Sequence, residues 1–292
     1  MERELWKILY LLARKLDNPW GSWRYSTAEV VAVYFWAVVH DRPTSWAADS
    51  AEWPDDLRPT WLPPQSTLSR RLRQPQVVEL MTAVEQHLLA ILALGQYLVK
   101  RIDGKALAVS KVSKDPDTGF GRGAGGMQKG YKFHAAWSRG PMPLAWGLAA
   151  MNVSEKIMAR GLIPTLPGGG YLLGDTQYDA NVLYDLAAEA GFQLVAKKTK
   201  GRGRGGLGHR RQSPGRLRSI ELLTTDFGRA LFNQRNAIEG HFSTLTCTAG
   251  GLAPLPAWVR RFHRVRHWVQ AKIITAGCRW LLLHEPQKLA FA

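Results

Sequence analysis

Residues 170–199, "GYLLGDTQYDANVLYDLAAEAGFQLVAKKT", decide the fold of this chain. An apolar run at 171–173 leads to a lone carboxylate, Asp175, and a helix-like segment at 180–191 is followed by a second β-rich segment at 192–199. This order of strand, helix and strand predicts a helical crossover within one sheet. Because buried strands rarely hold a charged residue, we interpret Asp175 as a functional group at the end of its strand.

Three further segments with strand composition precede this stretch, at 97–112, 129–137 and 143–151, and a helix is expected at 154–163. Together they predict an α/β fold with a mixed five-stranded sheet and flanking helices. The first three strands would form antiparallel hairpins, and helices would join the last two. The glycine-rich link at 119–130 is expected to be a flexible cationic loop that contacts phosphates.

The N-terminal part, residues 1–95, is expected to be helical, since apolar residues recur there at helical spacing. A short helix capped by Ser66 would hold Arg70 and Arg71. Two interpretations are open: a helix-turn-helix that reads DNA through these arginines, and a plain helical bundle with a solvated basic face. Another long helix is expected at 258–284, and its first half is rich in arginine.

The charge of the chain indicates an anionic partner. Of its 292 residues, 39 are Lys or Arg and 23 are Asp or Glu, so the formal net charge is +16. This favours nucleic acid as the partner, and an acidic membrane surface less so. The longest apolar run, 30–39, is too short to cross a bilayer, and residues 1–16 are typical of an amphipathic helix and not of a signal peptide. Two cysteines do not make a disulfide framework, so a cytoplasmic protein is expected.

A basic loop is expected at 197–218, where nine of 22 residues are Lys or Arg. Its glycine and proline content argues against a packed element. Its charge would make any affinity for DNA fall steeply with salt. The residues expected to contact DNA from this loop are Lys197, Lys198, Arg202, Arg204, Arg210 and Arg211.

Three acidic residues occupy unusual places: Asp103 within the first strand, Asp175 at the end of the fourth, and Glu239 in a helix. In an open α/β sheet, residues at strand ends face the crevice of the functional site. If the first and fourth strands are neighbours, Asp103 and Asp175 meet there, and a carboxylate from a following helix can complete the cluster. Crowded carboxylates repel one another unless cations neutralise them, and their oxygens suit Mg²⁺ or Mn²⁺. Two such ions can clamp the attacking and leaving oxygens of a phosphoryl transfer.

The helix around Glu239 allows two interpretations. Arg235 lies one turn before Glu239, so both share one helix face. In the first interpretation Arg235 holds a DNA phosphate beside a metal-binding Glu239; in the second the two form an ion pair on a solvated surface. The apolar residues expected to pack this helix on the sheet are Phe227, Leu231, Ile238, Phe242 and Leu245.

Two more polar residues lie close to the acids in sequence. Asp179 is interpreted first as the N-cap of the helix that begins near Ala180, and second as an additional or supporting metal ligand. His134, next to Lys132 on the second strand, is open between contact with a substrate and a structural role.

Four segments carry a family pattern in a fixed order: "RIDGKAL" (101–107), "GYKFHAAWSRGPMPLAW" (130–146), "LLGDTQYDAN" (172–181) and "RNAIEGHFSTL" (235–245). With them the chain resembles the DDE transposases of the IS4/IS5 insertion-sequence superfamily. The short gap between the last two segments is similar to that of the IS5-like group. The positions that match are Lys132, His134, Gly140, Pro143, Leu144, Asp175, Tyr178, Asp179, Arg235, Asn236, Ile238, Glu239, Phe242 and Leu245.

The resemblance implies an RNase H-like catalytic core at 96–256, with Asp103, Asp175 and Glu239 as the catalytic residues that hold two Mg²⁺ or Mn²⁺ ions. It implies that Lys132 and Arg235 contact DNA. The residues implied to support the metal ligands are Asp179, His134 and Tyr178.

The resemblance also implies a substrate and an assembly. The helical region 1–95 would bind the terminal inverted repeats, and 257–292 would form a basic C-terminal helix. A homodimer would cleave double-stranded DNA at the transposon ends and join it to target DNA. The chain departs from the family helix Y-x2-R-x3-E-x6-K at Phe232 and Thr246. Two other functions therefore stay open: a metal-dependent nuclease without strand transfer, and a domesticated DNA-binding protein.

Overall fold

The computed structural model describes residues 1–18, 24–123, 125–199, 207, 211–248 and 251–289. Two units can be distinguished. The helical unit comprises Met1–Leu92 and Thr244–Ala292, and the sheet unit comprises Ala93–Ser243. The segment that follows Ser243 therefore belongs with the N-terminal helices, whereas the sequence-based division ended the core at residue 256 and set 257–292 apart.

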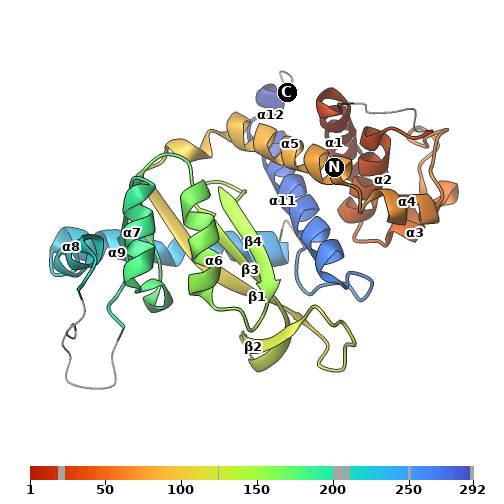
Figure 1. The fold of residues 1–292 in the computed structure, drawn as a ribbon. Helices are drawn as coiled ribbons and strands as arrows, with labels where there is room; N and C mark the ends of the chain where they lie inside the picture. The colour runs from red at the N-terminus through yellow and green to blue at the C-terminus, as the bar shows by residue number, and fades with distance from the viewer. Residues whose placement is uncertain (19–23, 124, 200–206, 208–210, 249–250, 290–292) are drawn as a thin grey trace. The chain divides into compact units, whose positions relative to one another are not determined.

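The helical unit is built around α2, Thr27–Val39, whose sequence is apolar on all sides (Figure 1). Every residue of α2 except Glu29 is buried, because a helix without a polar face is stable in water only when other helices surround it. The helices in contact with α2 are α1 (Glu2–Leu16), α3 (Thr44–Ala47), α4 (Gln65–Arg71), α5 (Pro75–Leu92) and α11 (Phe262–His284). A last short helix, α12, spans Pro286–Leu289. Within the described residues, no helix combines the length and apolar character needed to cross a membrane.

Helix α2 begins with a capping box. The Ser26 hydroxyl accepts a hydrogen bond from the Glu29 backbone N–H at 3.1 Å, and the Glu29 carboxylate accepts one from the Ser26 N–H at 2.7 Å. The expected cap of the short basic helix is wrong, because α4 begins at Gln65 after Pro64 and has no side-chain cap. Ser66 lies inside that helix and is exposed.

Arg71 is buried, with only 2% of its surface exposed. Its guanidinium donates to the Tyr25 carbonyl at 3.0 Å and to the Thr27 hydroxyl at 3.4 Å. Arg71 therefore fixes the start of α2 and is not part of an exposed basic face. This corrects its expected role as a DNA contact, whereas Arg70 is exposed.

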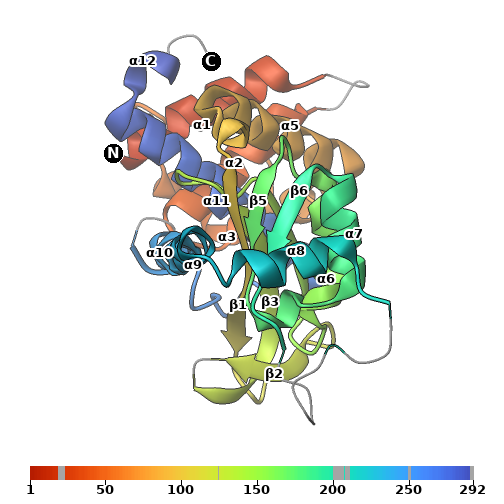
Figure 2. The ribbon, with the colours of Figure 1, turned by 90° about the vertical axis from the view of Figure 1, so that its left-hand side faces the viewer.

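In its described residues the sheet unit contains six strands, one more than the sequence predicted; Figure 2 shows the sheet from one side. The additional strand, β2 (Gly119–Gly123), pairs with the start of β3 (Gly126–Trp137), so the expected glycine-rich loop is a β-hairpin. The strand order is β2-β3-β1-β5-β6, and β4 also pairs with β3. The other strands are β1 (Val99–Val109), β4 (Ala145–Ala150), β5 (Gly170–Leu173) and β6 (Phe192–Val195).

The pairing directions follow the sequence prediction. β1 runs antiparallel to β3, and β3 runs antiparallel to β4. β5 is parallel to both β1 and β6. The long connections into the parallel strands contain α6 (Glu155–Leu162) and α7 (Asn181–Glu189), because parallel neighbours need a crossover.

Helices cover both faces of this sheet (Figures 1 and 2). A Cβ at Gly147 would meet Met158 of α6, and Gly147 pairs with His134. On the other side, Phe242 of α10 (Ala237–Ser243) packs edge-on against Phe133. Since consecutive residues of a strand point to opposite faces, α6 and α10 lie on opposite sides of β3.

The segment 213–222 departs from the expected basic loop. Residues Pro214–Leu222 form helix α8, although 214–218 were expected to be unpacked. Proline at the first helical position is favourable, because its fixed φ suits the helix and its missing N–H has no partner there anyway. The next helix is α9, Asp226–Asn233; it is followed by a 3₁₀ turn at Gln234–Asn236 and then by α10.

We expect Ser26→Ala to lower the free energy of unfolding by about 1 kcal/mol, because it removes one half of the capping box of α2. Ser66→Ala is the matched control, since this serine is exposed and caps no helix, and it should change stability by less than about 0.5 kcal/mol. Urea unfolding of the full chain measures both. Equal effects of the two substitutions would contradict the assignment of the cap.

Candidate metal centre

The parallel pairing of β1 with β5 brings Asp103 and Asp175 to equivalent positions. Arg101 pairs with Leu173, and each aspartate lies two residues beyond its member of this pair. β5 ends at Leu173, whereas β1 continues to Val109. The first and fourth predicted strands are thus neighbours, which was the condition for the two carboxylates to meet, and both carboxylates lie where the shorter strand ends.

A third carboxylate, Glu155, completes the group. One oxygen from each of Asp103, Glu155 and Asp175 lies within 4.8 Å of the other two. Glu155 is the first residue of α6, directly after Ser154, whose hydroxyl accepts a bond from the Ile157 N–H at 3.4 Å. Sequence reasoning missed Glu155, because an acid in the first turn of a capped helix is common as a partner of the helix dipole.

The electrostatics of the group are unfavourable for three negative charges. The pKa of Asp103 is raised from 3.8 to about 6, first by burial and then by the charges of Glu155 and Asp175. The Gly104 N–H, which donates to Asp103 at 2.8 Å, and the nearby Arg235 act in the opposite direction. The pKa of Asp103 remains raised, so the hydrogen bond from Gly104 and the charge of Arg235 do not fully offset burial and the neighbouring negative charges.

Two basic side chains touch the group from different elements. The ammonium of Lys132, on β3, forms an ion pair with Glu155. The guanidinium of Arg235 lies 3.6 Å from the carboxylate of Asp103. The structure therefore places both expected DNA contacts, Lys132 and Arg235, beside the carboxylates.

The hydroxyl of Tyr178 is a polar group near the three carboxylates that has no partner in the described part of the chain. Its side chain is fully buried, and its hydroxyl has no hydrogen-bond partner among the described residues. Burial and then the charges of Glu155, Asp103 and Asp175 raise its pKa, so the hydroxyl stays protonated close to these carboxylates. Gly174 makes this position possible, because a Cβ there would lie 2.9 Å from the Tyr178 ring.

The donor set fits a hard divalent cation. Asp103, Glu155 and Asp175 could hold a metal ion, and carboxylate oxygens are the ligands that Mg²⁺ and Mn²⁺ prefer. The second oxygen of Glu155 is buried and has no partner among the described residues. An ion or its bound water would satisfy this oxygen and the Tyr178 hydroxyl.

Glu239 lies outside this group in the structure. It is on α10 and is exposed, and its carboxylate is not among those that lie within 4.8 Å of one another. The helix is nevertheless anchored to the sheet, because the buried Arg101 donates to the Gln234 carbonyl at 2.6 Å and to the Ser138 carbonyl at 2.7 Å. This anchor places Arg235, and not Glu239, against Asp103.

Asp179 does not cap the helix that follows it, so that interpretation is wrong. The N-cap of α7 is Ala180, which has no side-chain cap. The Asp179 carboxylate instead receives two bonds of 2.7 Å from Arg216 and one of 2.8 Å from the Thr199 N–H. It ties α8 and the end of the β6 segment to the start of α7, and these bonds lower its pKa although burial alone would raise it.

His134 is buried, with 1% of its surface exposed. Burial, followed by the charge of Lys132, lowers its pKa to about 4, so the ring is neutral at pH 7. Neither ring nitrogen has a partner among the described residues. The sequence allowed two interpretations of His134. Because the ring is buried inside the sheet unit, the structural interpretation fits it, and contact with a large substrate does not.

Phe232 is also buried, with 8% exposed, in a cluster with Leu173, Val195 and Leu231. The ammonium of Lys197 lies 5.2 Å from the centre of its ring. Phe232 thus belongs to the core that fixes α9. Of the apolar residues expected to pack on the sheet, Phe227 is instead 59% exposed.

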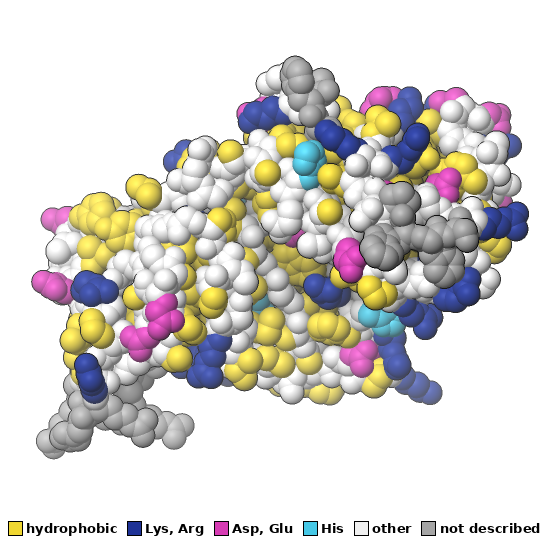
Figure 3. All heavy atoms as spheres, turned by 45° about the horizontal axis from the view of Figure 1, so that its top comes forward, with side chains coloured by type: hydrophobic (Ala, Val, Ile, Leu, Met, Phe, Trp, Pro, Cys, Tyr) yellow, Lys and Arg dark blue, Asp and Glu magenta, His cyan; other side chains and the backbone are white. Residues whose placement is uncertain are grey.

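The remaining cationic residues are distributed unevenly. Lys197 and Arg211 are exposed and Lys198 is half-buried. Arg202, Arg204 and Arg210 lie outside the described residues. On the face that Figure 3 shows, Lys and Arg side chains are scattered among apolar and acidic ones and do not form one continuous patch.

The raised pKa of Asp103 predicts a pH-dependent cost to the folded state. Between pH 4 and pH 6 the folded protein retains a proton that the unfolded chain, with a pKa near 3.8, releases, so stability falls as the pH rises. In EDTA at pH 7.5, Asp103→Asn should therefore raise the free energy of unfolding by on the order of 2 kcal/mol. The gain should vanish below about pH 4.

Urea unfolding at several pH values measures this effect. Asp185→Asn is the matched control, because Asp185 is an exposed carboxylate on α7. If Asp103→Asn is no more stable than the wild type at pH 7.5, the charged form of Asp103 does not destabilise the folded protein, and this prediction is wrong.

The comparisons with known proteins return no relative. No family model matches the chain, and no curated protein and no solved structure matches it. The resemblance to the IS4/IS5 transposases thus depends on the motifs in the sequence. The function has to be inferred from those motifs together with the geometry of the three carboxylates.

Proposed function

We propose that the protein is an insertion-sequence transposase of the IS4/IS5 type. In this proposal it binds terminal inverted repeats and uses two divalent ions to cleave DNA strands and join them to a target. The observation that carries the proposal is the meeting of Asp103 and Asp175, from adjacent parallel strands, with a third carboxylate within 4.8 Å. The family named in this proposal is inferred from the sequence motifs around these two aspartates.

The topology of the sheet supports the proposal. Antiparallel pairing of β1, β3 and β4 is followed by parallel pairing of β5 and β6 through helical crossovers. A mixed sheet of this kind is what an RNase H-like core requires, with its acidic residues on the central strand and on the parallel strand beside it. In this proposal, Asp103 on β1 and Asp175 after β5 are the residues that correspond to these two places.

The residues of the chain would divide the work as follows. Asp103, Asp175 and Glu155 offer the carboxylate oxygens that would hold the ions. Bound ions would lower the pKa of the attacking water or 3′-hydroxyl and stabilise the departing oxygen. Arg235, with 20% of its side chain exposed, is placed to receive a DNA phosphate next to Asp103.

Lys132 has a second task in this proposal. Its ammonium neutralises part of the charge of Glu155 while no ion is bound. The two side chains are only 17% and 13% exposed, so the pair is held together with little competition from water. Binding of a divalent ion at the carboxylates would weaken this pair and free the ammonium for a phosphate.

The identity of the third carboxylate can be tested directly. The geometry favours Glu155, whereas the family pattern implies Glu239. We expect Mg²⁺ or Mn²⁺ to raise the melting temperature of the wild type. Glu155→Gln should weaken the metal affinity at least about tenfold, because even the loss of a group that supports a metal ligand typically costs about 10- to 100-fold. Glu239→Gln should keep the affinity of the wild type in the absence of DNA, because this residue is exposed and outside the group.

Differential scanning calorimetry over a metal titration measures these affinities. If Glu239→Gln abolishes the metal effect and Glu155→Gln does not, the family pattern is right, and α10 must move on metal binding.

DNA cleavage tests the function itself. The full chain is incubated with DNA ends carrying the inverted repeats that flank its gene, a target plasmid and Mg²⁺. We expect joined products from the wild type. Asp175→Asn should lose at least about a hundredfold in cleavage rate while retaining DNA binding, because a metal ligand is removed but no cationic surface.

The products separate the alternatives. Cut but unjoined DNA would indicate a nuclease without strand transfer, and binding without cutting would indicate a domesticated DNA-binding protein. Asp185→Asn, an exposed carboxylate on α7, should cleave like the wild type. If Asp175→Asn cleaves DNA at the normal rate, Asp175 does not belong to the catalytic site.

A further inference from the structure

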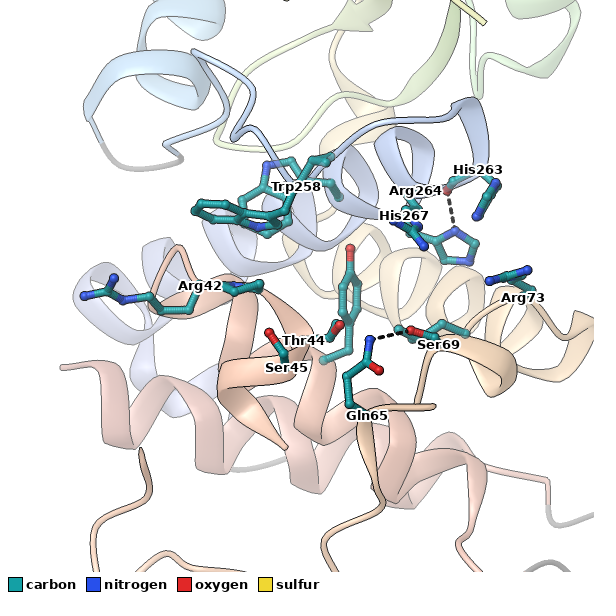
Figure 4. A pocket seen from close by; sticks show the side chains of 15 residues that line it. Arg42, Thr44, Ser45, Gln65, Ser69, Arg73, Trp258, His263, Arg264 and His267 are labelled. Carbon is teal, nitrogen blue, oxygen red and sulfur yellow. Dashed lines mark hydrogen bonds between the residues drawn. The ribbon is translucent and has the colours of Figure 1, made fainter. Parts of the chain in front are cut away.

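The helical unit contains a cavity of about 220 Å³. It is lined by Tyr34 of α2, by residues 42–45 at the start of α3, by the α4 region, and by the start of α11 with the residues that precede it. Figure 4 shows Gln65 and Ser69, from α4, across from His263 and His267 on α11. All the lining residues belong to the helical unit, so this cavity is separate from the three carboxylates.

The cavity has an aromatic wall. Trp268 is buried, with 2% exposed, and Tyr34 is buried, with 6% exposed. Trp258, 42% exposed, lies at the rim. Large planar side chains at the wall and at the rim favour a flat ligand that can stack on them.

Two buried polar atoms of the wall have no partner. The His267 ring is 9% exposed, and its Nδ1 lies 2.6 Å from the His263 carbonyl (Figure 4). A carbonyl only accepts, so Nδ1 carries the proton and Nε2 is an acceptor. Neither this Nε2 nor the Trp268 indole N–H has a hydrogen-bond partner among the described residues. Buried groups of this kind are normally satisfied, so the packing behind this wall leaves one acceptor and one donor without a bond.

The remaining lining is cationic. Arg42, Arg73 and Arg264 are exposed and line the cavity, and no Asp or Glu does. In the described part of the chain, none of the three forms an ion pair with a carboxylate. Arginine presents a fork of donors that matches a phosphate. The rim is therefore suited to an anion.

We propose that this cavity binds a single nucleotide unit, with the base inside and the phosphate at the arginines. A volume of about 220 Å³ lies below the roughly 300–1,000 Å³ of pockets for drug-sized ligands, so it admits one heterocycle and leaves the phosphate at the mouth. A base has the flat face for Trp258, and its edge has both donors and acceptors for the polar side chains of the lining, such as Gln65 and Ser69. An inorganic phosphate would leave the aromatic wall without a partner.

The nucleotide can come from two sources. One is a base turned out of a DNA strand, and this version rests on the proposed function. The other is a free mononucleotide, which is independent of it. Both present the same chemistry to the cavity, and the experiment separates them.

The test uses the full-length protein and two probes. Isothermal titration with the four deoxynucleoside monophosphates measures binding of the free nucleotide. Terminal-repeat duplexes with 2-aminopurine at successive positions report a base that leaves the stack through a change in fluorescence. We expect binding or a fluorescence change with at least one of these probes.

The variants locate the site. Trp258→Ala and Arg264→Ala should each weaken the response by about tenfold, since each removes one stacking or charge contact. Arg3→Ala is the matched control, because Arg3 is an exposed arginine of the same unit that does not line the cavity. Asp103→Asn should keep the response, because Asp103 does not line the cavity. The test of the cavity is therefore independent of whether the carboxylates bind a metal. Circular dichroism confirms that each variant is folded.

Each outcome is decisive. A response to mononucleotides assigns the free ligand, and a response only to labelled DNA assigns the everted base. No response to either probe overturns the proposal, and so does a response that Trp258→Ala and Arg264→Ala leave unchanged.

Discussion

The repulsion among three half-buried carboxylates is the constraint around which the sheet unit is organised. The pairing of Arg101 with Leu173 brings Asp103 and Asp175 together, and α6 adds Glu155 to them. Each charge has some relief from nearby groups, but the pKa of Asp103 remains raised to about 6. A fold that holds such a cluster in the absence of a ligand stores an affinity for a cation, because binding removes the repulsion.

The backbone around the cluster is shaped to allow this crowding. A Cβ at Gly104 would lie 2.9 Å from the side chain of Lys132 and 3.0 Å from the ring of His134. Gly174 likewise leaves room for the ring of Tyr178. Two glycines next to the two aspartates therefore let large side chains reach the site from neighbouring elements. Any other residue at either position would displace the groups that tune the carboxylates.

The sequence predicted the parts of the site that depend on strand order. The strand, helix and strand at 170–199 and the position of Asp175 follow from local patterns. That the first and fourth strands are neighbours was only a condition at that stage, and the pairing of β1 with β5 fulfils it. Glu155 was missed, since its first-turn position is also that of an ordinary dipole partner. Asp179 was misassigned, because its partner Arg216 is 37 residues away and only folding brings the two together.

Burial accounts for the other differences. Arg71 and Phe232 have the residue types of DNA contacts, and both are enclosed in their units. The spacing of residues along one helix gives the face on which a side chain lies, but not what covers that face. The segment 214–218 has the composition of a loop, and Pro214 nonetheless opens a helix.

The helical unit is made of two stretches of chain separated by the whole sheet unit. During synthesis the first 92 residues leave the ribosome long before α11, whose side chains pack against α1, α2 and α5. The sheet unit, from Ala93 to Ser243, is continuous and can complete its core first. The cavity of the helical unit, which needs α11, would therefore be the last part to form, and a chain cut after residue 243 would retain the carboxylates and lack the cavity.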